Sequence, residues 1–143
     1  MGSTKPRVLV IDDEPGIGRA CSRLLSAWYT TTYVESGEEA LALIRSGVRF
    51  DVGLVDLLLR GISGESFWRA VEEIDPLQAA RLLIHSGACS VTETSFMARK
   101  WPRTVRKPAS CAELREAIDA VIDVYGRVTP ETEEQVETAQ HAA

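Results

Sequence analysis

Residues 8–17 read VLVIDDEPGI, a run of four apolar residues followed directly by three carboxylates, a proline and a glycine. The apolar run predicts a strand over 7–12, of the near-continuous kind that is buried on both faces in a parallel sheet. Pro15 is well placed for the first turn of a following helix. Carboxylates this close repel one another and resist leaving water unless a cation meets them. The stretch therefore raises the question of which cationic partners the rest of the chain supplies.

The same alternation of an apolar run and a helical pattern continues along the chain. Strands are predicted over five ranges: 7–12, 30–35, 51–57, 81–86 and 104–107. Helices are predicted after them: one from Pro15 with Ile17, Cys21, Leu24, Leu25 and Trp28 at helical spacing, and others over 38–46, 64–75, 92–100 and 111–125. Ser36 with Glu39, and Ser110 with Glu113, have the spacing of capping boxes. Five β-α units predict an α/β fold, a doubly wound parallel sheet with helices on both faces.

The composition of the 143 residues is that of one soluble globular domain, with 45% hydrophobic and 26% charged residues. The formal net charge of -5 argues against a general nucleic-acid binder. No apolar run approaches the roughly 20 residues of a membrane span, and the N-terminus lacks the apolar core of a secretory signal. Cys21, Cys89 and Cys111 form no CxxC pair, so neither a disulfide framework nor a zinc site is indicated. These features predict a protein of the reducing cytoplasm.

The last residues, 127–143, differ in character from the rest. They contain few large apolar residues and a group of glutamates: Glu131, Glu133, Glu134 and Glu137. Such a segment predicts a mobile acidic tail. The alternative is the start of a linker to a further domain.

Polar residues stand at the carboxyl ends of four predicted strands. In chain order they are Asp12 and Asp13, Asp56, Ser86, and Lys107. In a doubly wound sheet, ligands gather beyond the carboxyl ends of the strands, where the strand order reverses. These five side chains are therefore expected to converge on one edge of the sheet.

Such a set of groups suits a divalent cation and a phosphoryl group. Mg²⁺ takes oxygen ligands, typically carboxylates, waters and phosphate oxygens. An aspartate can attack phosphorus, while a lysine and a hydroxyl stabilise charge on the transferring group. Taken singly, each residue has a plainer explanation: an aspartate as a helix N-cap, Lys107 as a solvated turn residue, Ser86 as a loop residue. Their shared position at one end of successive strands favours the phosphoryl site.

With these residues placed, the chain resembles the receiver domain of two-component response regulators, the CheY-like family. The resemblance covers about residues 6–126 and rests on IDDEP after the first strand, LVDLLLRGISG around Asp56, LLIHSGA, and VRKP. It implies the flavodoxin-like (βα)5 fold with strand order 2-1-3-4-5. It also implies a phosphoacceptor signalling domain of a phosphorelay rather than an enzyme.

The resemblance assigns a role to each acidic residue. Asp56 looks like the phosphoacceptor, which receives a phosphoryl group from a sensor histidine kinase or a histidine phosphotransfer protein. Asp12 and Asp13 look like the acidic pair that binds Mg²⁺. Asp56 and the backbone carbonyl of Leu58 would complete the ligands that the protein supplies.

The remaining site positions both follow and depart from the family pattern. Ser86 looks like the hydroxyl that turns toward the phosphoryl group, and Lys107 like its cationic partner. Thr104 stands where receivers usually carry an aromatic residue that swings inward on activation, so that movement is not available here. Trp101 would either substitute in part or simply pack on the sheet edge. Leu59-Arg60 stands where many receivers have Met-Pro.

Leu58 and Ala88 occupy positions where family members tune hydrolysis of the phosphoryl group. Neither side chain can orient an attacking water. Slow autodephosphorylation is therefore expected.

Four basic residues lie close together in the sequence of an otherwise acidic protein: Arg99, Lys100, Arg103 and Arg106. In receivers, the face formed here by 92–126 commonly meets an output partner or another receiver. The alternative is a solvated charged face.

Two other functions remain open. A receiver-like interaction module that works without phosphorylation would explain Thr104. An aspartate-dependent phosphatase of another doubly wound class usually carries a DxD arrangement after the first strand, whereas Asp12 and Asp13 are adjacent. Nucleotide binding is not indicated, since no GxGxxG or GxxxxGK[ST] loop follows any strand.

Overall fold

A computed structural model describes residues 5–57, 59–87 and 104–128. Its sheet consists of the parallel strands β1 (Arg7–Ile11), β2 (Thr30–Val34), β3 (Val52–Val55), β4 (Leu82–Ser86) and β5 (Thr104–Arg106). They lie in the order β2-β1-β3-β4-β5. The predicted doubly wound sheet and its strand order are therefore confirmed, and every strand lies within its predicted range.

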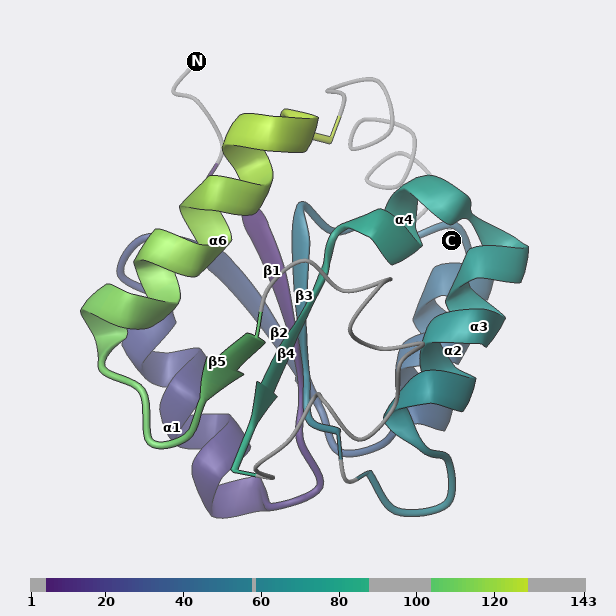
Figure 1. Ribbon diagram of the computed structural model, residues 1–143, viewed down its shortest axis with the longest axis horizontal. Helices are drawn as coiled ribbons and strands as arrows, with labels where there is room; N and C mark the ends of the chain where they lie inside the picture. Colours follow the sequence, from purple (N-terminus) through teal and green to yellow (C-terminus); the bar gives the residue numbers. More distant parts are fainter. Residues whose placement is uncertain (1–4, 58, 88–103, 129–143) are drawn as a thin grey trace, which may run out of the picture.

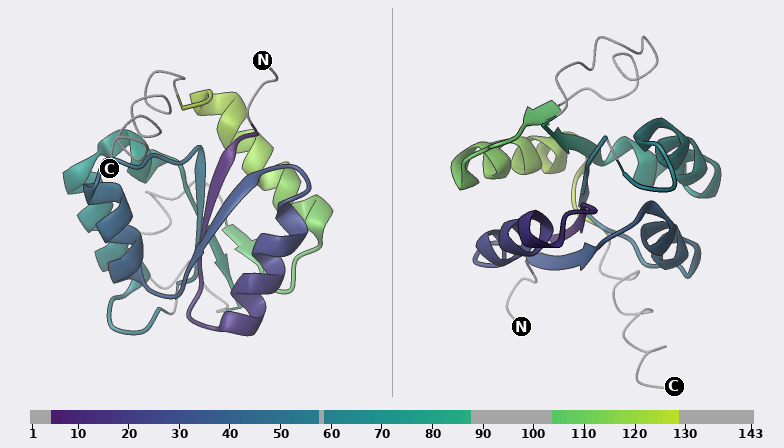
Figure 2. Two further views of the ribbon diagram at one scale, coloured as in Figure 1. Left: turned by 180° about the vertical axis from the view of Figure 1, so that it is seen from behind. Right: turned by 90° about the horizontal axis from the view of Figure 1, so that it is seen from below.

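Helices cover both faces of the sheet. Those of the described residues are α1 (Pro15–Leu25), α2 (Gly37–Arg45), α3 (Gly64–Ile74), α4 (Pro76–Ala80) and α6 (Cys111–Tyr125). Helices α1 and α6 lie on one face, and α2, α3 and α4 lie on the other (Figure 1, Figure 2). The helix predicted over 92–100 lies outside the described residues.

This two-sided cover explains why the strand sequences are continuously apolar. In β1, Leu9 and Ile11 pack into the core beside α2 and α3, whereas Val8 and Val10 pack into the core beside α1 and α6. Burying each such side chain stabilises the fold by about 1.5–3 kcal/mol relative to leaving it in water. An alternating pattern would have left one face of this strand polar.

Serine N-caps begin three of the predicted helices, at Ser36, Ser63 and Ser110. Ser36 accepts a hydrogen bond from the backbone N–H of Glu39 at 3.1 Å, and Ser110 accepts one from that of Glu113 at 3.1 Å. The Glu113 carboxylate also accepts the backbone N–H of Ser110 at 3.3 Å, which completes the capping box of α6. In α2, the Glu39 carboxylate instead accepts the Ser36 hydroxyl at 3.4 Å. Only the box of α6 is therefore complete.

Helix α4 was not predicted. The pattern over 64–75 predicts a helix that ends before Pro76, and α3 does end at Ile74. Pro76 then begins a separate short helix, because its missing N–H is one that a first helical turn leaves unpaired. The Asp75 side chain caps this helix by accepting the backbone N–H of Leu77 at 3.0 Å.

The apolar residues at helical spacing around α1 do not share one environment. Cys21 and Leu25 are buried, but Ile17 is 40% and Leu24 62% exposed. Trp28 lies beyond the end of α1 and is 40% exposed. Helical spacing therefore overstates the buried face, and α1 presents apolar side chains to solvent.

At the amino-terminal edge of the sheet, Asp51 joins three segments of the chain. Its fully buried carboxylate accepts the backbone N–H of Arg7 at 2.7 Å and that of Val128 at 2.6 Å. Arg127 adds an ion pair at 3.6 Å. The first two residues of the predicted tail are thus held against the sheet, and 129–143 lie outside the described residues.

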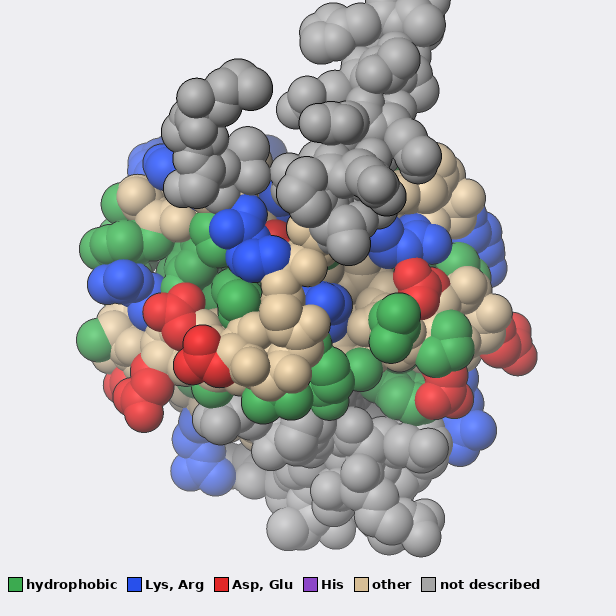
Figure 3. Space-filling view, turned by 90° about the horizontal axis from the view of Figure 1, so that it is seen from above, with side chains coloured by type: hydrophobic (Ala, Val, Ile, Leu, Met, Phe, Trp, Pro, Cys, Tyr) green, Lys and Arg blue, Asp and Glu red, His purple; other side chains and the backbone are tan. Residues whose placement is uncertain are grey.

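Arg81 makes a second set of contacts at this edge. Its guanidinium donates hydrogen bonds to the carbonyls of Gly126 at 2.7 Å and Tyr125 at 3.0 Å, groups that the end of α6 would otherwise leave unpaired. Figure 3 views the molecule from this side and shows several Lys and Arg side chains around the edge. Within the described residues, no helix has both the length and the apolar character needed to cross a bilayer.

Candidate functional site

The predicted site residues meet at the carboxyl edge of the sheet. Asp12 and Asp13 follow β1, Asp56 follows β3, Ser86 ends β4, and Lys107 follows β5. Asp12, Asp56 and Ser86 are buried, whereas Asp13 and Lys107 are half-buried. The parallel sheet thereby brings together residues from four strand ends, as their sequence positions predict.

Three carboxylates form the centre of the site. One oxygen from each of Asp12, Asp13 and Asp56 lies within 4.8 Å of the others. Carboxylate oxygens are ligands that Mg²⁺ prefers, so the donor set and its spacing fit a hard divalent cation. Leu58, the remaining residue of the expected ligand set, lies outside the described residues.

Asp56 contacts the hydroxyl of Ser86 and the ammonium of Lys107, as predicted from the sequence. The Ser86 hydroxyl donates to Asp56 Oδ1 at 3.0 Å, and Lys107 Nζ donates to Asp56 Oδ2 at 3.1 Å. Lys107 Nζ also donates to Asp12 Oδ2. The backbone N–H of Lys107 bonds to the carbonyl of Ser86 at 3.0 Å, which keeps the ends of β4 and β5 in register. The plainer explanations of Ser86 and Lys107 as a loop and a solvated turn residue are therefore wrong.

Local contacts fix the position of Asp12. Its Oδ1 accepts the backbone N–H of Glu14 at 3.0 Å, and the Tyr33 hydroxyl donates to its carbonyl at 2.7 Å. Gly18 permits the approach of Tyr33, since a Cβ at residue 18 would lie 2.1 Å from a ring carbon. Glu14, not an aspartate, is the N-cap residue of α1. The explanation of Asp12 and Asp13 as N-caps is therefore wrong.

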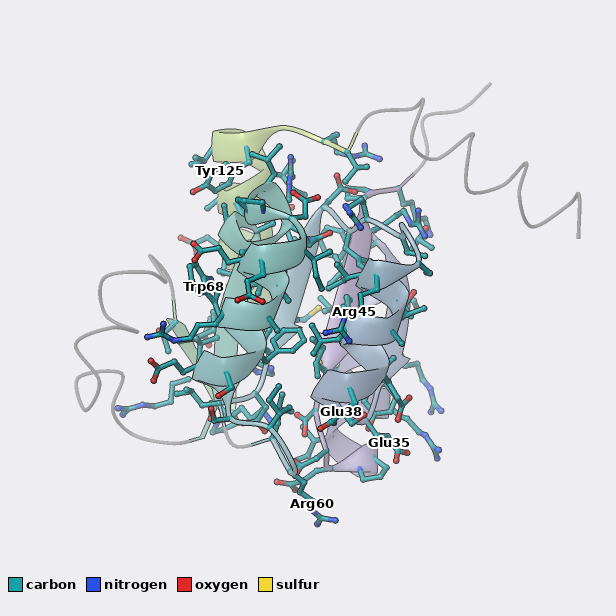
Figure 4. All side chains as sticks on the ribbon, turned by 90° about the vertical axis from the view of Figure 1, so that its right-hand side faces the viewer. Glu35, Glu38, Arg45, Arg60, Trp68 and Tyr125 are labelled. Atoms are coloured by element: carbon teal, nitrogen blue, oxygen red, sulfur yellow. The ribbon has the colours of Figure 1, made fainter. Side chains whose placement is uncertain are left out.

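Two cationic side chains lie beside the carboxylates, and Lys107 does most to offset their repulsion. Burial lowers the pKa of Lys107. The hydrogen bonds to Asp12 and Asp56 and the attraction of their charges together raise it by more than burial lowers it, so the pKa lies above its ordinary value. The ammonium is therefore charged at neutral pH. Arg60 Nε lies 3.3 Å from Asp13 Oδ2, but its side chain is 86% exposed and contributes little. Figure 4 shows Arg60 at this end of the molecule.

A cavity of about 1030 Å³ extends from the carboxylates along α1 to the start of α6. His85 lines this cavity and is 7% exposed. Burial, followed by the charge of Lys107, lowers the pKa of His85, so its ring is neutral at pH 7. The strand prediction over 81–86 passes over this residue, and a polar side chain directly after the apolar residues Leu82–Ile84 is the signal that identifies it.

Thr104 is exposed in β5, where the resemblance implies an aromatic residue, and Arg106 is exposed in the same strand. Further residues singled out in the sequence lie outside the described residues: Ala88, Arg99, Lys100, Trp101 and Arg103. The predicted partner face over 92–126 is therefore described only from residue 104 onward.

Comparison with known families and structures gives a consistent result. The family described as "Response regulator receiver domain" matches residues 8–119. No curated protein sequence matches this chain.

Several solved structures are similar along nearly their whole length. The structure titled adenylate cyclase from Rhodopirellula baltica is 27% identical, with a TM-score of 0.77, and the match covers 93% of this chain and 98% of that one. A CheY-like receiver domain protein from Methanospirillum hungatei JF-1 is 23% identical, with a TM-score of 0.74 and coverage of 93% and 99%. The beryllofluoride-activated NtrC4 receiver domain dimer is 25% identical, with a TM-score of 0.74 and coverage of 83% and 98%.

Proposed function

Because this chain belongs to the response regulator receiver domain family, we propose that it accepts a phosphoryl group on Asp56. The donor is a phosphohistidine of a sensor histidine kinase or of a histidine phosphotransfer protein, and the chain acts as a switch in a two-component phosphorelay. The family is one of signalling domains rather than of classical enzymes. The observation that supports Asp56 as acceptor is its contact with Ser86 at 3.0 Å and Lys107 at 3.1 Å within the acidic cluster.

In the proposed reaction, a carboxylate oxygen of Asp56 attacks the phosphorus of the donor. A P–O bond forms, the P–N bond breaks, and its electron pair leaves with the imidazole nitrogen. Ser86 and Lys107 already lie within hydrogen-bond distance of Asp56, so a short movement would bring them to the phosphoryl oxygens. There they would stabilise the charge that develops on the transferring group.

The acidic cluster supports a role for Mg²⁺. Asp12, Asp13 and Asp56 would hold the ion, together with the backbone carbonyl of Leu58. When bound, Mg²⁺ supplies positive charge that neutralises the carboxylates and the phosphoryl oxygens. The residues of this chain would orient the acceptor carboxylate toward the donor.

The switch would be driven by charge. Phosphorylation adds roughly two negative charges beside Ser86 and Lys107, which would shift a two-state equilibrium in the region from β4 to α6. Thr104 offers no aromatic ring, so the change would rely on the backbone and on Ser86. The face over 92–126 would present the change to an output partner or to a second copy.

The domain limits, the lifetime of the phosphorylated state and the cellular location belong to the same proposal. The receiver domain would span 6–126, and 127–143 would form an acidic tail or linker. Leu58 and Ala88 cannot orient water, so the phosphorylated protein would be long-lived. A cytoplasmic location is supported by the free cysteines of the described residues, which suit a reducing compartment.

Intact-mass spectrometry after incubation with acetyl phosphate, with and without Mg²⁺, tests the proposal. One Mg²⁺-dependent phosphoryl adduct is expected in the wild type and none in Asp56→Asn. Asp123→Asn changes an exposed carboxylate of α6 and serves as the matched control, with the same adduct as the wild type.

A folded wild-type protein that forms no adduct would contradict the proposal. That result would favour an interaction module that works without phosphorylation, which the exposed Thr104 in β5 also suits. Turnover of external phosphate esters would instead favour an aspartate-dependent phosphatase.

A further inference from the structure

The cavity beside Asp56 is larger than a phosphoryl group requires. Its volume of about 1030 Å³ lies at the upper end of the range for sites that bind small organic molecules, about 300–1,000 Å³. It begins at the polar groups of the acceptor site and continues between α1 and the loop that leads into α6. The cavity therefore has room for a ligand that extends well beyond the phosphorus atom.

The part of the cavity away from Asp56 is apolar. Ile17 and Leu24 of α1 form one side, and Leu114 of α6 and Pro108 form the other. Ile17 and Leu24 are 40% and 62% exposed, so apolar surface is left open to solvent along this wall. A bound apolar group would cover that surface and gain the free energy of removing it from water.

His85 provides a polar group inside the same cavity. Its side chain is 7% exposed and lines the cavity beside Ser86 and Lys107. Burial and the charge of Lys107 lower its pKa, so the neutral ring carries one donor and one acceptor nitrogen. The carbonyl of a ligand in the cavity would accept a hydrogen bond from the donor nitrogen of this ring.

One type of molecule matches both halves of the cavity. We propose that the cavity binds non-protein phosphodonors with an apolar leaving group, of the class of aromatic acyl phosphates, and that it favours them over acetyl phosphate. The phosphoryl group would lie at Asp56, the ring against Ile17, Leu24 and Leu114, and the acyl carbonyl within reach of His85. The inference rests on the proposed function, because it assigns a donor class to the same acceptor.

The chemical step is a simple phosphoryl transfer. An Asp56 carboxylate oxygen forms a bond to phosphorus, and the bond between phosphorus and the acyl oxygen breaks. The electron pair leaves with that oxygen, so the products are an aspartyl phosphate and an aromatic carboxylate. No oxidant, reductant or further reactant is needed.

The test compares benzoyl phosphate with acetyl phosphate in the full chain, with Mg²⁺ present. For each donor, the second-order rate constant of adduct formation is measured by intact-mass spectrometry. The decisive quantity is the ratio of the benzoyl to the acetyl rate constant, which removes effects common to both donors. In Ile17→Gln combined with Leu24→Gln, this ratio is expected to fall about fivefold below that of the wild type, because apolar contact with the ring is lost.

Leu77→Gln is the matched control. Leu77 is 72% exposed on α4 and does not line the cavity, so the same chemical change there should leave the ratio unchanged. The substituted positions of α1 are also exposed, and glutamine is a good helix former, so both variants are expected to fold.

A binding measurement gives a readout that does not depend on transfer. Phenacylphosphonate, in which a carbon replaces the bridging oxygen of benzoyl phosphate, cannot donate its phosphoryl group. Its addition should shift the ring NMR signals of His85 and leave those of His141, the other histidine of the sequence, in place.

The outcomes separate this inference from the proposed function. If neither donor labels Asp56, the proposed function itself fails. If acetyl phosphate labels Asp56 but the ratio is the same in the wild type and the α1 variant, only the donor inference is overturned. The apolar wall of α1 would then be assigned to contact with a protein partner.

Discussion

At Lys107, one ammonium group lies against the buried carboxylates of Asp12 and Asp56. Lys107→Met keeps the side-chain length but leaves both carboxylates without this cation. Removal of one partner from a buried ion pair costs about 3 kcal/mol or more, so the free energy of unfolding at pH 7 should fall by about 3 kcal/mol. Urea unfolding without Mg²⁺ measures this loss, and added Mg²⁺ should recover part of it.

The same contact gives a dependence on pH. Because the folded-state pKa of Lys107 is raised above its ordinary value of 10.5, its contribution to stability is complete below that value and is lost as the pH rises through the folded pKa. The difference in unfolding free energy between the wild type and Lys107→Met should therefore shrink above pH 10.5. Lys5→Met, at an exposed position, is the control, and a constant difference at every pH would contradict the assignment.

At this scale, the sequence predicts which residues reach the site but not how they contact one another. Asp12, Asp56, Ser86 and Lys107 are predictable because the end of a strand is a local property of the apolar pattern. Which carboxylate oxygen accepts from Ser86 depends on side-chain torsions that no sequence pattern records. His85 was missed because one polar residue directly after the three apolar residues Leu82–Ile84 does not change the prediction of a strand.

At the scale of the element, α6 depends on its first turn. Ser110 and Glu113 form reciprocal hydrogen bonds that satisfy backbone N–H groups before the helix bonds begin. Ser110→Ala should lower the free energy of unfolding by about 1 kcal/mol, a change that thermal or urea unfolding resolves. Ser110→Asn, which retains a capping oxygen, should be nearly neutral, and equal losses in both variants would point to a different cause.

Helices and strands were predicted well where one strong local signal decides them. The serine caps located the starts of α2 and α6, because a capping side chain acts within four residues of itself. Helix α4 was missed because Pro76 ends one helix and begins another, and the sequence signal for the two events is the same. The exposure of Leu24 was also missed, since helical spacing does not report how far the neighbouring helix extends over a face.

At the scale of the molecule, Asp51 connects the start of β1 with the segment that follows α6. Asp51→Asn removes the charge from a buried group with hydrogen bonds at 2.7 Å and 2.6 Å. Hydrogen bonds to a charged group contribute about 1.5–3 kcal/mol, so a loss of about 2 kcal/mol is expected in urea unfolding. Asp123→Asn should be neutral, and hydrogen exchange should show faster exchange at the Val128 amide in Asp51→Asn alone.

The topology of the sheet was predictable, but the contacts that join the two ends of the domain were not. Right-handed crossovers allow few arrangements of five β-α units, so the alternation predicted the doubly wound parallel sheet, while the strand order was implied by the resemblance to the receiver family. Asp51 was read as the first residue of a strand, although it is the group that holds Arg7 and Val128. Contacts between the two ends of a domain depend on the completed fold, and no local window of sequence contains them.

Helix α6 starts four residues after Lys107, and Arg81 holds its other end through the carbonyls of Tyr125 and Gly126. The helix is about 22 Å long, and Figure 4 shows Tyr125 at the opposite end of the molecule from Arg60. It therefore has the geometry of a lever arm whose fulcrum is the Arg81 contact. A tilt of roughly 5° about that fulcrum would move the end near Lys107 by about 2 Å. A change of charge at the carboxyl edge of the sheet would in this way become a movement of the start of α6, and the length of the helix sets the size of that movement.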